Sequence, residues 1–478
     1  MYIKNANVII FTDFTPTRIW SRNAGPYRIA TEVRQHGYTC QVVDCFTSMT
    51  EAQVFELIDG AVGPNTLMIG ISTTFVQAKN TNNNSAMKRY LDRVKSINPN
   101  TKIVIGGFKA LARIDLSWYA DAKITGLADR AIVDYLKFLE NKNPFFTYTV
   151  NEFGQICVDG DKCHPLFDFQ NSFIKYEPED NILENETMVI EISRGCIFNC
   201  KFCSYSLNGK RKNDYIKNPS VLRDEFIRNY EEYGITKYIY SDDTHNDNTY
   251  KLSTLADIVQ SLPFKLEYST YLRLDLLKAH PEQYELLKAG GLRGAFFGIE
   301  TLNHEAAKLI GKGIRPEAAI AELHKVREQM PDVAVTTSYI IGLPKETKES
   351  IYQWTNQLMD PNFPTDGISL NHLSLTRGSW KVHKSTFEIE ANNYVKWKEG
   401  DDYHWIGEHF DQQWAKEYTL QLTNQLAHRF KIAGLEVHSA SHGTDMNFSK
   451  QSSIESAMQI DFLRDHIRAR YIEKLLTN

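Results

Sequence analysis

Three cysteines at the spacing C-x3-C-x2-C constrain this chain more than any other feature. They are Cys196, Cys200 and Cys203, close enough in sequence for their thiolates to serve one metal centre. A cubane [4Fe-4S] cluster usually takes four cysteine ligands, so three thiolates would leave one iron open to a small molecule. Two alternatives remain open, a zinc site completed by a distant residue and ordinary buried thiols. A zinc ribbon normally shows a second C-x2-C or a His pair, and neither follows the triad.

The length of 478 residues indicates roughly two to four domains. Apolar residues make up 42% and charged residues 24%, which is ordinary for a soluble globular protein. The net charge of −5 gives no global basic field, so nucleic acid is not an expected partner. No secretory signal and no run of about 18 apolar residues is present, so we expect no membrane partner. Seven cysteines, three of them clustered, do not resemble a disulfide framework and favour a reducing cytoplasm.

Short apolar strands alternate with helical patterns through residues 1–142. This alternation predicts an α/β domain with a doubly wound parallel sheet in a flavodoxin-like or Rossmann-like order. Ligands of such sheets bind beyond the carboxyl ends of the strands. The expected strands are 7–12, 38–44, 66–72, 102–107 and 122–126, with helices near 25–36, 51–59, 83–96, 108–115 and 128–140.

A connector follows over residues 143–185, with alternation around Asn151-Glu-Phe-Gly154 that predicts a hairpin. Longer strand–helix units then fill residues 186–380 and predict a barrel-like parallel sheet. Because the cysteines come directly after its first strand, they belong to the carboxyl face, where such barrels carry their chemistry. Residues 381–478 form a mainly helical C-terminal segment. The expected barrel strands are 188–193, 237–242, 265–271, 294–300, 335–341 and 367–375, with helices near 219–232, 250–261, 277–289, 304–329 and 347–359.

The cysteine run has an aromatic residue, Phe202, just before its last cysteine, and distinctive residues end each later strand. Together these features resemble the radical S-adenosylmethionine (SAM) superfamily, whose barrel is a partial (β/α)6 version of the TIM fold. The resemblance implies that Cys196, Cys200 and Cys203 bind a [4Fe-4S] cluster. It also implies that SAM chelates the open iron and is cleaved reductively to a 5'-deoxyadenosyl radical.

The same resemblance assigns SAM contacts to the strand ends. Ser241, Asp242 and Asp243 stand where the family binds the SAM ammonium, and a turn or helix cap is the alternative. Arg273 would bind the SAM carboxylate, or else form a surface salt bridge. Glu300 would contact ribose or ammonium, because a carboxylate on a hydrophobic strand needs a partner. The remaining assignments are Lys312 as a partner for an acid, Gly342 for close backbone approach, Ile341 or Leu343 beside adenine, and Glu346 as an early helix acid.

Residues 1–142 are similar to the cobalamin-binding domain that precedes many radical SAM domains. The likeness rests on Ile69–Ser72, Ile103–Gly107 and Thr125–Asp129. The D-x-H-x-x-G motif with the cobalt-binding histidine is absent, so a cofactor-free Rossmann-like domain remains open. No G-x-G-x-x-G follows the first strand, which argues against a dinucleotide.

The resulting expectation is a cytoplasmic radical SAM enzyme, with cobalamin-dependent methyl transfer to an unreactive carbon as the leading outcome. The alternatives are a cobalamin-independent oxidoreductase or rearrangement enzyme, and a zinc-stabilised binding protein without turnover. The first domain has no second cysteine triad, which argues against a methylthiotransferase. Expected partners are a small-molecule or peptide substrate and an electron donor such as flavodoxin or ferredoxin.

Overall fold

The computed structural model divides into two compact units. One contains described residues up to Glu184 together with those from Arg464 onward, and the other contains those from 186 to Leu463. The expected helix near 108–115 lies outside the described residues. These residues are 1–13, 20–74, 76, 84–107, 110, 119–143, 145–163, 167–184, 186–204, 215–377, 384–426 and 457–477.

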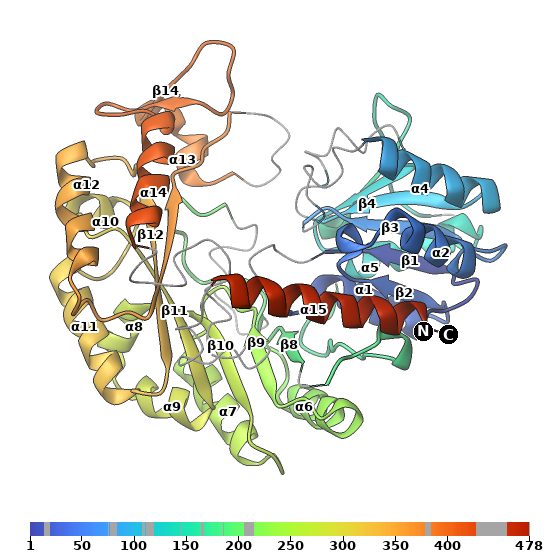
Figure 1. The fold of residues 1–478 in the computed structure, drawn as a ribbon, viewed down its shortest axis with the longest axis horizontal. Helices are drawn as coiled ribbons and strands as arrows, with labels where there is room; N and C mark the ends of the chain where they lie inside the picture. Colours follow the sequence, from blue (N-terminus) through green and yellow to red (C-terminus); the bar gives the residue numbers. More distant parts are fainter. Residues whose placement is uncertain are drawn as a thin grey trace. The chain divides into compact units, whose positions relative to one another are not determined.

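The first unit contains a seven-stranded sheet in the order β2-β1-β3-β4-β5-β7-β6 (Figure 1). Its first five strands pair in parallel in the flavodoxin-like order that the sequence predicts. All residues of β1 and β2 are buried, so both faces of the sheet are covered at that point. The strands are β1 (Val8–Phe11), β2 (Cys40–Val43), β3 (Met68–Ser72), β4 (Lys102–Gly106), β5 (Ala122–Thr125), β6 (Thr149–Val150) and β7 (Ile156–Asp159).

Helices of this unit pack in two pairs. α1 (Ala24–Gln35) contacts α5 (Ala128–Leu139), and α2 (Glu51–Ala61) contacts α4 (Asn84–Ile97). α2 begins where Thr50 forms a capping box with Gln53, because each satisfies a backbone N–H that the helix leaves open. The alternation of strands and helices therefore forms the α/β layers that the sequence predicts.

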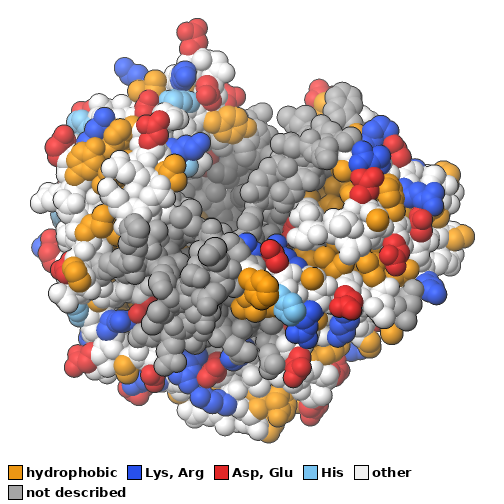
Figure 2. Space-filling model, in the orientation of Figure 1, with side chains coloured by type: hydrophobic (Ala, Val, Ile, Leu, Met, Phe, Trp, Pro, Cys, Tyr) orange, Lys and Arg blue, Asp and Glu red, His pale blue; other side chains and the backbone are white. Residues whose placement is uncertain are grey.

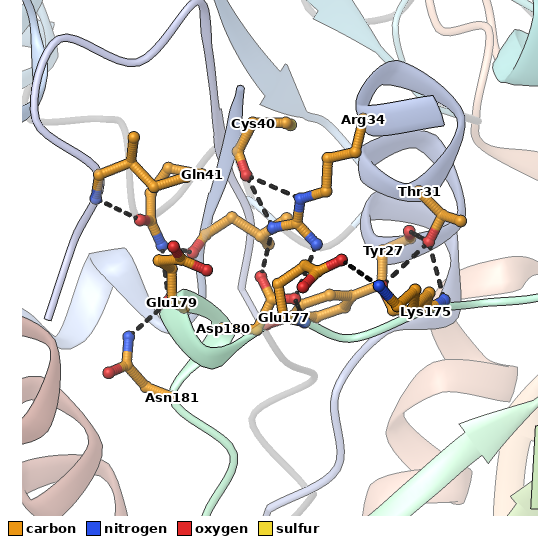
Figure 3. Close-up of polar contacts among 12 residues, drawn as sticks. Tyr27, Thr31, Arg34, Cys40, Gln41, Lys175, Glu177, Glu179, Asp180 and Asn181 are labelled. Atoms are coloured by element: carbon orange, nitrogen blue, oxygen red, sulfur yellow. Dashed lines mark hydrogen bonds and ion pairs between the residues drawn. The ribbon is translucent and has the colours of Figure 1, made fainter. Parts of the chain in front are cut away.

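The hairpin expected in the connector forms, but it extends the first sheet. β6 and β7 are antiparallel, and β7 pairs in parallel with β5. The chain after the hairpin is held by polar contacts with α1 and β2 (Figure 3). Arg34 binds both carboxylate oxygens of Asp180, at 2.8 and 2.7 Å, and Gln41 donates to the backbone oxygen of Glu179 at 3.1 Å. Residues up to Glu184 are therefore part of the first unit.

The last helix, α15 (Ala457–Leu476), returns to this unit with its residues from Arg464 onward. Tyr471 is fully buried, its ring lies 5.1 Å from Trp20, and its hydroxyl accepts a hydrogen bond from the Asp44 N–H. The sequence pattern places this helix in the C-terminal segment 381–478. Only the buried contacts of Tyr471 show that it completes the first unit.

The second unit contains a six-stranded, entirely parallel sheet in the order β13-β12-β11-β10-β9-β8 (Figure 1). Because consecutive strands are neighbours and run in parallel, all six carboxyl ends lie along one edge. The strands are β8 (Thr187–Ile190), β9 (Lys237–Tyr240), β10 (Glu267–Leu272), β11 (Leu292–Glu300), β12 (Ala334–Ile341) and β13 (Gly367–His372).

Two expected helices of this unit are interrupted. The helix expected over 277–289 is α8 (Leu274–Ala279) and α9 (Gln283–Ala289), because Pro281 cannot continue the helix ladder. The helix expected over 304–329 breaks at Gly311, which has a φ of +83°. Its parts are α10 (His304–Leu309) and α11 (Pro316–Gln329), and the other helices between strands are α6 (Pro219–Tyr233), α7 (Thr249–Gln260) and α12 (Lys348–Thr355).

A C-terminal part covers the end of this sheet. It contains α13 (Thr386–Ile389), β14 (Lys396–Trp397), β15 (Trp405–Ile406) and α14 (Gln412–Leu426), and α14 packs on β12 and β13. Among the described residues, no helix has the length and apolarity needed to span a membrane. On the face drawn in Figure 2, the described Lys and Arg side chains are interspersed with Asp and Glu, in keeping with the net charge of −5.

Candidate active site

The three cysteines lie on the loop that follows β8, at the carboxyl edge of the second sheet. Cys196 is buried, Cys200 and Cys203 are half-buried, and all three are free thiols. Gly195 has a φ of +108°, a conformation that favours glycine and turns the chain before Cys196. Burial raises the pKa of the Cys196 thiol, while a hydrogen bond with the Thr244 hydroxyl, 3.4 Å away, and one from the Phe198 N–H lower it. Donors to the sulfur stabilise a thiolate ligand.

Asp242, directly after β9, holds the start of this loop. One of its oxygens accepts the backbone N–H groups of Ile192 and Ser193, at 3.1 and 2.9 Å. The other accepts His245 Nδ1 at 3.0 Å and Lys251 Nζ at 3.2 Å. Burial alone would raise the pKa of Asp242, but Lys251 and His245 outweigh it and hold that pKa well below the usual range. Both carboxylate oxygens are thus engaged by protein donors, whereas the sequence assigns Asp242 to the SAM ammonium.

Lys251 makes this a network instead of a single ion pair. Its ammonium lies 2.7 Å from Asp247 Oδ1 and 3.1 Å from Ser193 Oγ, and the residue is 2% exposed. His245 is also fully buried, and its ring lies 5.3 Å from that of Tyr240. A buried charge is tolerated only with such partners. Ser241 and Asp243, on either side of Asp242, are exposed.

Arg273 follows β10 and contacts the cysteine loop. Its Nε and one terminal nitrogen bind the two oxygens of Asp275, at 3.0 and 2.6 Å. The other terminal nitrogen donates to Cys200 Sγ at 3.4 Å, and the guanidinium lies 3.8 Å from the Phe198 ring centroid. Burial works against the charge, but Asp275 outweighs it and raises the pKa of Arg273. The sequence assigns Arg273 to the SAM carboxylate, and the structure places its guanidinium between Asp275 and Cys200.

Glu300 ends β11 at a bulge, with a φ of +71°. The partners that its burial requires come from the protein, with Lys312 Nζ at 3.3 Å and Ser338 Oγ at 3.3 Å. Lys312 also donates to the backbone oxygen of Gly298 at 2.7 Å and lies 5.9 Å from the Phe202 ring centroid. The expected pairing of Lys312 with an acid is therefore present, and it brings Phe202 and Glu300 to the same lysine.

Gly342 follows β12 with a φ of +97°. A Cβ at this position would lie 3.1 Å from Trp405, 3.2 Å from Ala415 and 3.4 Å from Phe410. The close backbone approach expected here is therefore made by the C-terminal part of the same unit. Ile341 and Leu343, expected beside adenine, are both buried, at 0% and 1% exposure.

Glu346 has a larger role than an early helix acid. It is 2% exposed and accepts hydrogen bonds from Thr301 Oγ1 at 2.7 Å, Trp354 Nε1 at 3.1 Å and the Leu343 N–H at 3.0 Å. Burial raises its pKa to about 7, although these hydrogen bonds oppose the rise. Glu346 thus ties the residue after β11 to the turn after β12.

The middle of the cysteine loop is anchored to two other segments. The Lys201 N–H donates to the backbone oxygen of Ile310 at 3.4 Å, and the Lys201 oxygen accepts the Phe387 N–H at 3.0 Å. The Lys201 ammonium donates to the Tyr394 hydroxyl at 3.3 Å.

Sequence reasoning did not identify His245, Asn246 and Lys251 as parts of the site. The polar run Ser241–Asn248 directly after a buried strand is the signal that could have indicated His245 and Asn246, whereas Lys251 lies beyond it in α7.

The arrangement of the cysteines bears on which metal group fits them. Among the described residues, no three His, Cys, Asp or Glu side chains gather as they would around one metal ion. A zinc ion draws its thiolates to one centre at about 2.3 Å, whereas a cubane distributes its ligands over separate irons. Donors to the sulfurs stabilise thiolates, the form in which cysteine binds either metal group. The first unit also has a cavity of about 700 Å³, lined by residues of α5, β5 and β7 and by none of the expected site residues.

Comparison with known sequences gives one family match and relatives that cover part of the chain. The family model of the radical SAM superfamily matches residues 190–358, which include all three cysteines. The uncharacterized methyltransferase PH0819 of Pyrococcus horikoshii is 30% identical over 164 residues, 34% of this chain and 34% of that protein. The ribosomal protein uS12 methylthiotransferase RimO of Carboxydothermus hydrogenoformans is 24% identical over 245 residues, 49% of this chain and 54% of its own length. The chain therefore spans about a third to a half of these curated relatives.

Solved structures resemble more of the chain. TsrM from Kitasatospora setae, a radical SAM methyltransferase with tryptophan substrate and a SAM analog bound, has a TM-score of 0.64 at 12% identity, over 97% of this chain and 99% of its own. The cobalamin-dependent SAM radical enzyme OxsB has a TM-score of 0.58 at 14% identity, over 93% of this chain and 64% of its own. These likenesses show a shared α/β fold with parallel sheets. The likeness to the radical SAM superfamily itself rests on the match of residues 190–358 to the family model.

Proposed function

We propose that this chain is a radical SAM enzyme in which Cys196, Cys200 and Cys203 hold a [4Fe-4S] cluster and SAM completes its coordination. The observation that carries the proposal is the position of the triad. It lies within the matched stretch 190–358 and directly after the first of six parallel strands. The cluster would supply the electron that cleaves SAM to a carbon-centred radical.

The protein groups around the triad support this role. The Phe198 N–H and Arg273 donate to the sulfurs of Cys196 and Cys200 and so stabilise thiolates. Asp242 fixes the backbone where the loop begins. Of the expected SAM contacts, we retain Ser241 and Asp243 for the ammonium, because both are exposed beside the loop.

Glu300, paired with Lys312, would bind the ribose or the ammonium of SAM. Phe202, whose ring lies beside Lys312, would contact SAM as well. Arg273 would reach the SAM carboxylate only through a nitrogen already engaged by protein. The close approach at Gly342 is made by the C-terminal part, so we assign Gly342 no direct contact with SAM. We also propose that the six-stranded sheet is a partial (β/α)6 barrel, that residues 186–380 form the catalytic domain, and that a C-terminal segment after 381 shapes the substrate pocket.

The first unit would bind cobalamin, which would supply the methyl group for transfer to an unreactive carbon. One buried polar atom at the carboxyl edge of its sheet supports this proposal. Thr12, after β1, is fully buried with a hydroxyl that has no hydrogen-bond partner among the described residues. In support, TsrM has been solved with cobalamin and a [4Fe-4S] cluster bound, and OxsB with aqua-cobalamin and SAM bound.

The proposed substrate is a small molecule or peptide, and the electron would come from a flavodoxin-like or ferredoxin-like donor.

The domain boundary at 142, with 143–185 as a connector, describes a change in the sequence pattern. In the structure, the described residues up to Glu184 form one compact unit.

Anaerobic reconstitution of the full chain with iron and sulfide tests the enzyme. We expect a brown protein that cleaves SAM to 5'-deoxyadenosine on reduction, and a C203A variant that does neither. A colourless protein that instead binds zinc tightly would favour the binding protein without turnover. Incubation with hydroxocobalamin tests the first unit separately, because failure to retain cobalt would leave that unit as a scaffold while the enzyme stands.

A further inference from the structure

Arg273 is a buried arginine whose side chain reaches a proposed cluster ligand. It is 6% exposed and follows the last residue of β10. One terminal nitrogen lies 3.4 Å from Cys200 Sγ, within the range of a hydrogen bond to sulfur. A permanently charged donor in so sheltered a position acts on the sulfur more strongly than it would in water.

The guanidinium has a fixed orientation. Asp275 accepts from Nε at 3.0 Å and from one terminal nitrogen at 2.6 Å, which is the paired geometry of an arginine–carboxylate bond. This pairing leaves the remaining terminal nitrogen directed to Cys200. Although the pair is neutral as a whole, its positive end faces the sulfur and its negative end lies on the other side.

The backbone and the ring face of Arg273 are fixed as well. Asn246 accepts the Arg273 N–H at 2.8 Å and donates to the Arg273 oxygen at 2.9 Å. Gln283 holds the Asn246 side chain in turn, at 3.1 Å. The Phe198 ring covers the guanidinium at 3.8 Å, and Phe198 itself belongs to the cysteine loop. The arginine is therefore held from the strand side and covered from the loop side.

We propose that Arg273 is a positioning residue that orients Cys200 and raises the reduction potential of the cluster bound by the triad. This inference rests on the proposed function. Reduction adds one electron, and therefore one negative charge, to the cluster and its thiolates. A fixed cation with an N–H···S hydrogen bond stabilises the reduced form more than the oxidised form, so it makes the potential less negative.

The test is an EPR-monitored redox titration of the reconstituted full chain, with dithionite as the electron source. R273Q should take up iron and sulfide as the wild type does and show a more negative midpoint potential. R273K keeps the positive charge but lacks the paired N–H groups of the guanidinium. Its midpoint potential should lie between those of the wild type and R273Q. R293Q is the matched control, because Arg293 also forms an arginine–carboxylate pair, with Glu267 at 2.9 Å, but near the start of β11. Its potential should equal that of the wild type.

A full cluster content in R273Q at the wild-type potential would overturn the proposal. If R273Q assembles no cluster, R273K decides, since a potential equal to the wild type overturns the proposal and a more negative one supports it. A wild-type protein that takes up no iron and sulfide would instead reject the proposed function. The two failures are therefore distinguishable.

Discussion

Each unit contains a fully buried ion pair whose acid follows the second strand, in chain order, of its sheet. The two pairs fix different parts of the protein. In the first unit Asp44, after β2, pairs with Arg22 at 2.9 Å. Arg22 also donates to the backbone oxygens of Asp180 and Asn181, at 2.7 and 3.0 Å, and lies 5.2 Å from the Tyr471 ring. This pair joins distant parts of the scaffold.

In the second unit Asp242, after β9, pairs with Lys251 and fixes the loop that carries the cysteines. Removing one partner of either pair takes away a buried countercharge, so both are costly to break. The comparison teaches that a buried charge at a strand end is not in itself evidence of ligand binding. The segments that the pair fixes decide whether it stabilises the scaffold or positions the cysteine loop.

The largest expected effect comes from breaking the two pairs in parallel. D242A and D44A should each lower the free energy of unfolding by about 3–5 kcal/mol. D44A leaves Arg22 buried without its acid, and D242A leaves Lys251 with Asp247 alone and two backbone N–H groups without their acceptor. Only D242A should also abolish cluster assembly, since only Asp242 holds the start of the cysteine loop. Denaturant unfolding and iron content measure the two effects. Equal loss of iron uptake in D44A would remove the distinction between the pairs.

D243A is the control for D242A in the same turn. Asp243 is exposed, so its removal should change stability by about 0.5 kcal/mol or less. Under the proposed function it should still weaken SAM binding, which calorimetry with the reconstituted protein would show. A strongly destabilised D243A would mean that the turn after β9 is held in another way.

The pH dependence of Glu346 sharpens the contrast with Asp242, because Glu346 is buried among neutral donors. Its folded pKa of about 7 exceeds the ordinary value of 4.5, so between these values the folded state binds more protons than the unfolded state. Its contribution to stability is complete below pH 4.5 and is lost as the pH rises through 7, by at most about 3 kcal/mol. E346Q should flatten this part of the profile. Unfolding midpoints measured from pH 4.5 to 8 check it, and an unchanged slope in E346Q would contradict it.

A smaller effect is expected from the glycine where the C-terminal part approaches the sheet edge. G342A should lose about 1–3 kcal/mol, because the left-handed backbone is strained and the new Cβ meets Trp405 and Ala415. G311A has a similar φ of +83° with nothing within 4 Å, so it should lose only about 1 kcal/mol. The difference between their thermal unfolding midpoints isolates the contact with the C-terminal part. Equal losses would show that backbone strain alone matters.

The smallest effect on stability is expected at Thr12 in the first unit. T12V replaces an unpartnered buried hydroxyl with a group of similar shape, so stability should stay the same or rise by up to about 1 kcal/mol. Cobalamin retention should nevertheless fall if this hydroxyl serves a ligand. A marked loss of stability in T12V would show that the hydroxyl has a protein partner.

Much of the fold could be predicted from hydrophobic pattern, since apolar runs indicated β1 to β5 of the first sheet and all six strands of the second. The hairpin β6–β7 was expected in the connector, not as an extension of the first sheet. The interruptions near Pro281 and Gly311 were missed, because helical spacing continues on both sides of each break. The packing of α15 in the first unit was also missed, since nothing in its sequence pattern indicates that Tyr471 is buried there.

The sequence by itself determined the cysteine triad, its place after a strand, and a polar or glycine residue at each later strand end, because spacing and strand order are local properties. Only the tertiary structure decided what those residues bind. The carboxylate of Asp242 and the guanidinium of Arg273 are engaged by Lys251 and Asp275, and Glu300 is engaged by Lys312. Whether a charged side chain is open to a ligand depends on which partners the folded chain brings within hydrogen-bond distance, and here these partners lie on the helix or loop that follows each strand.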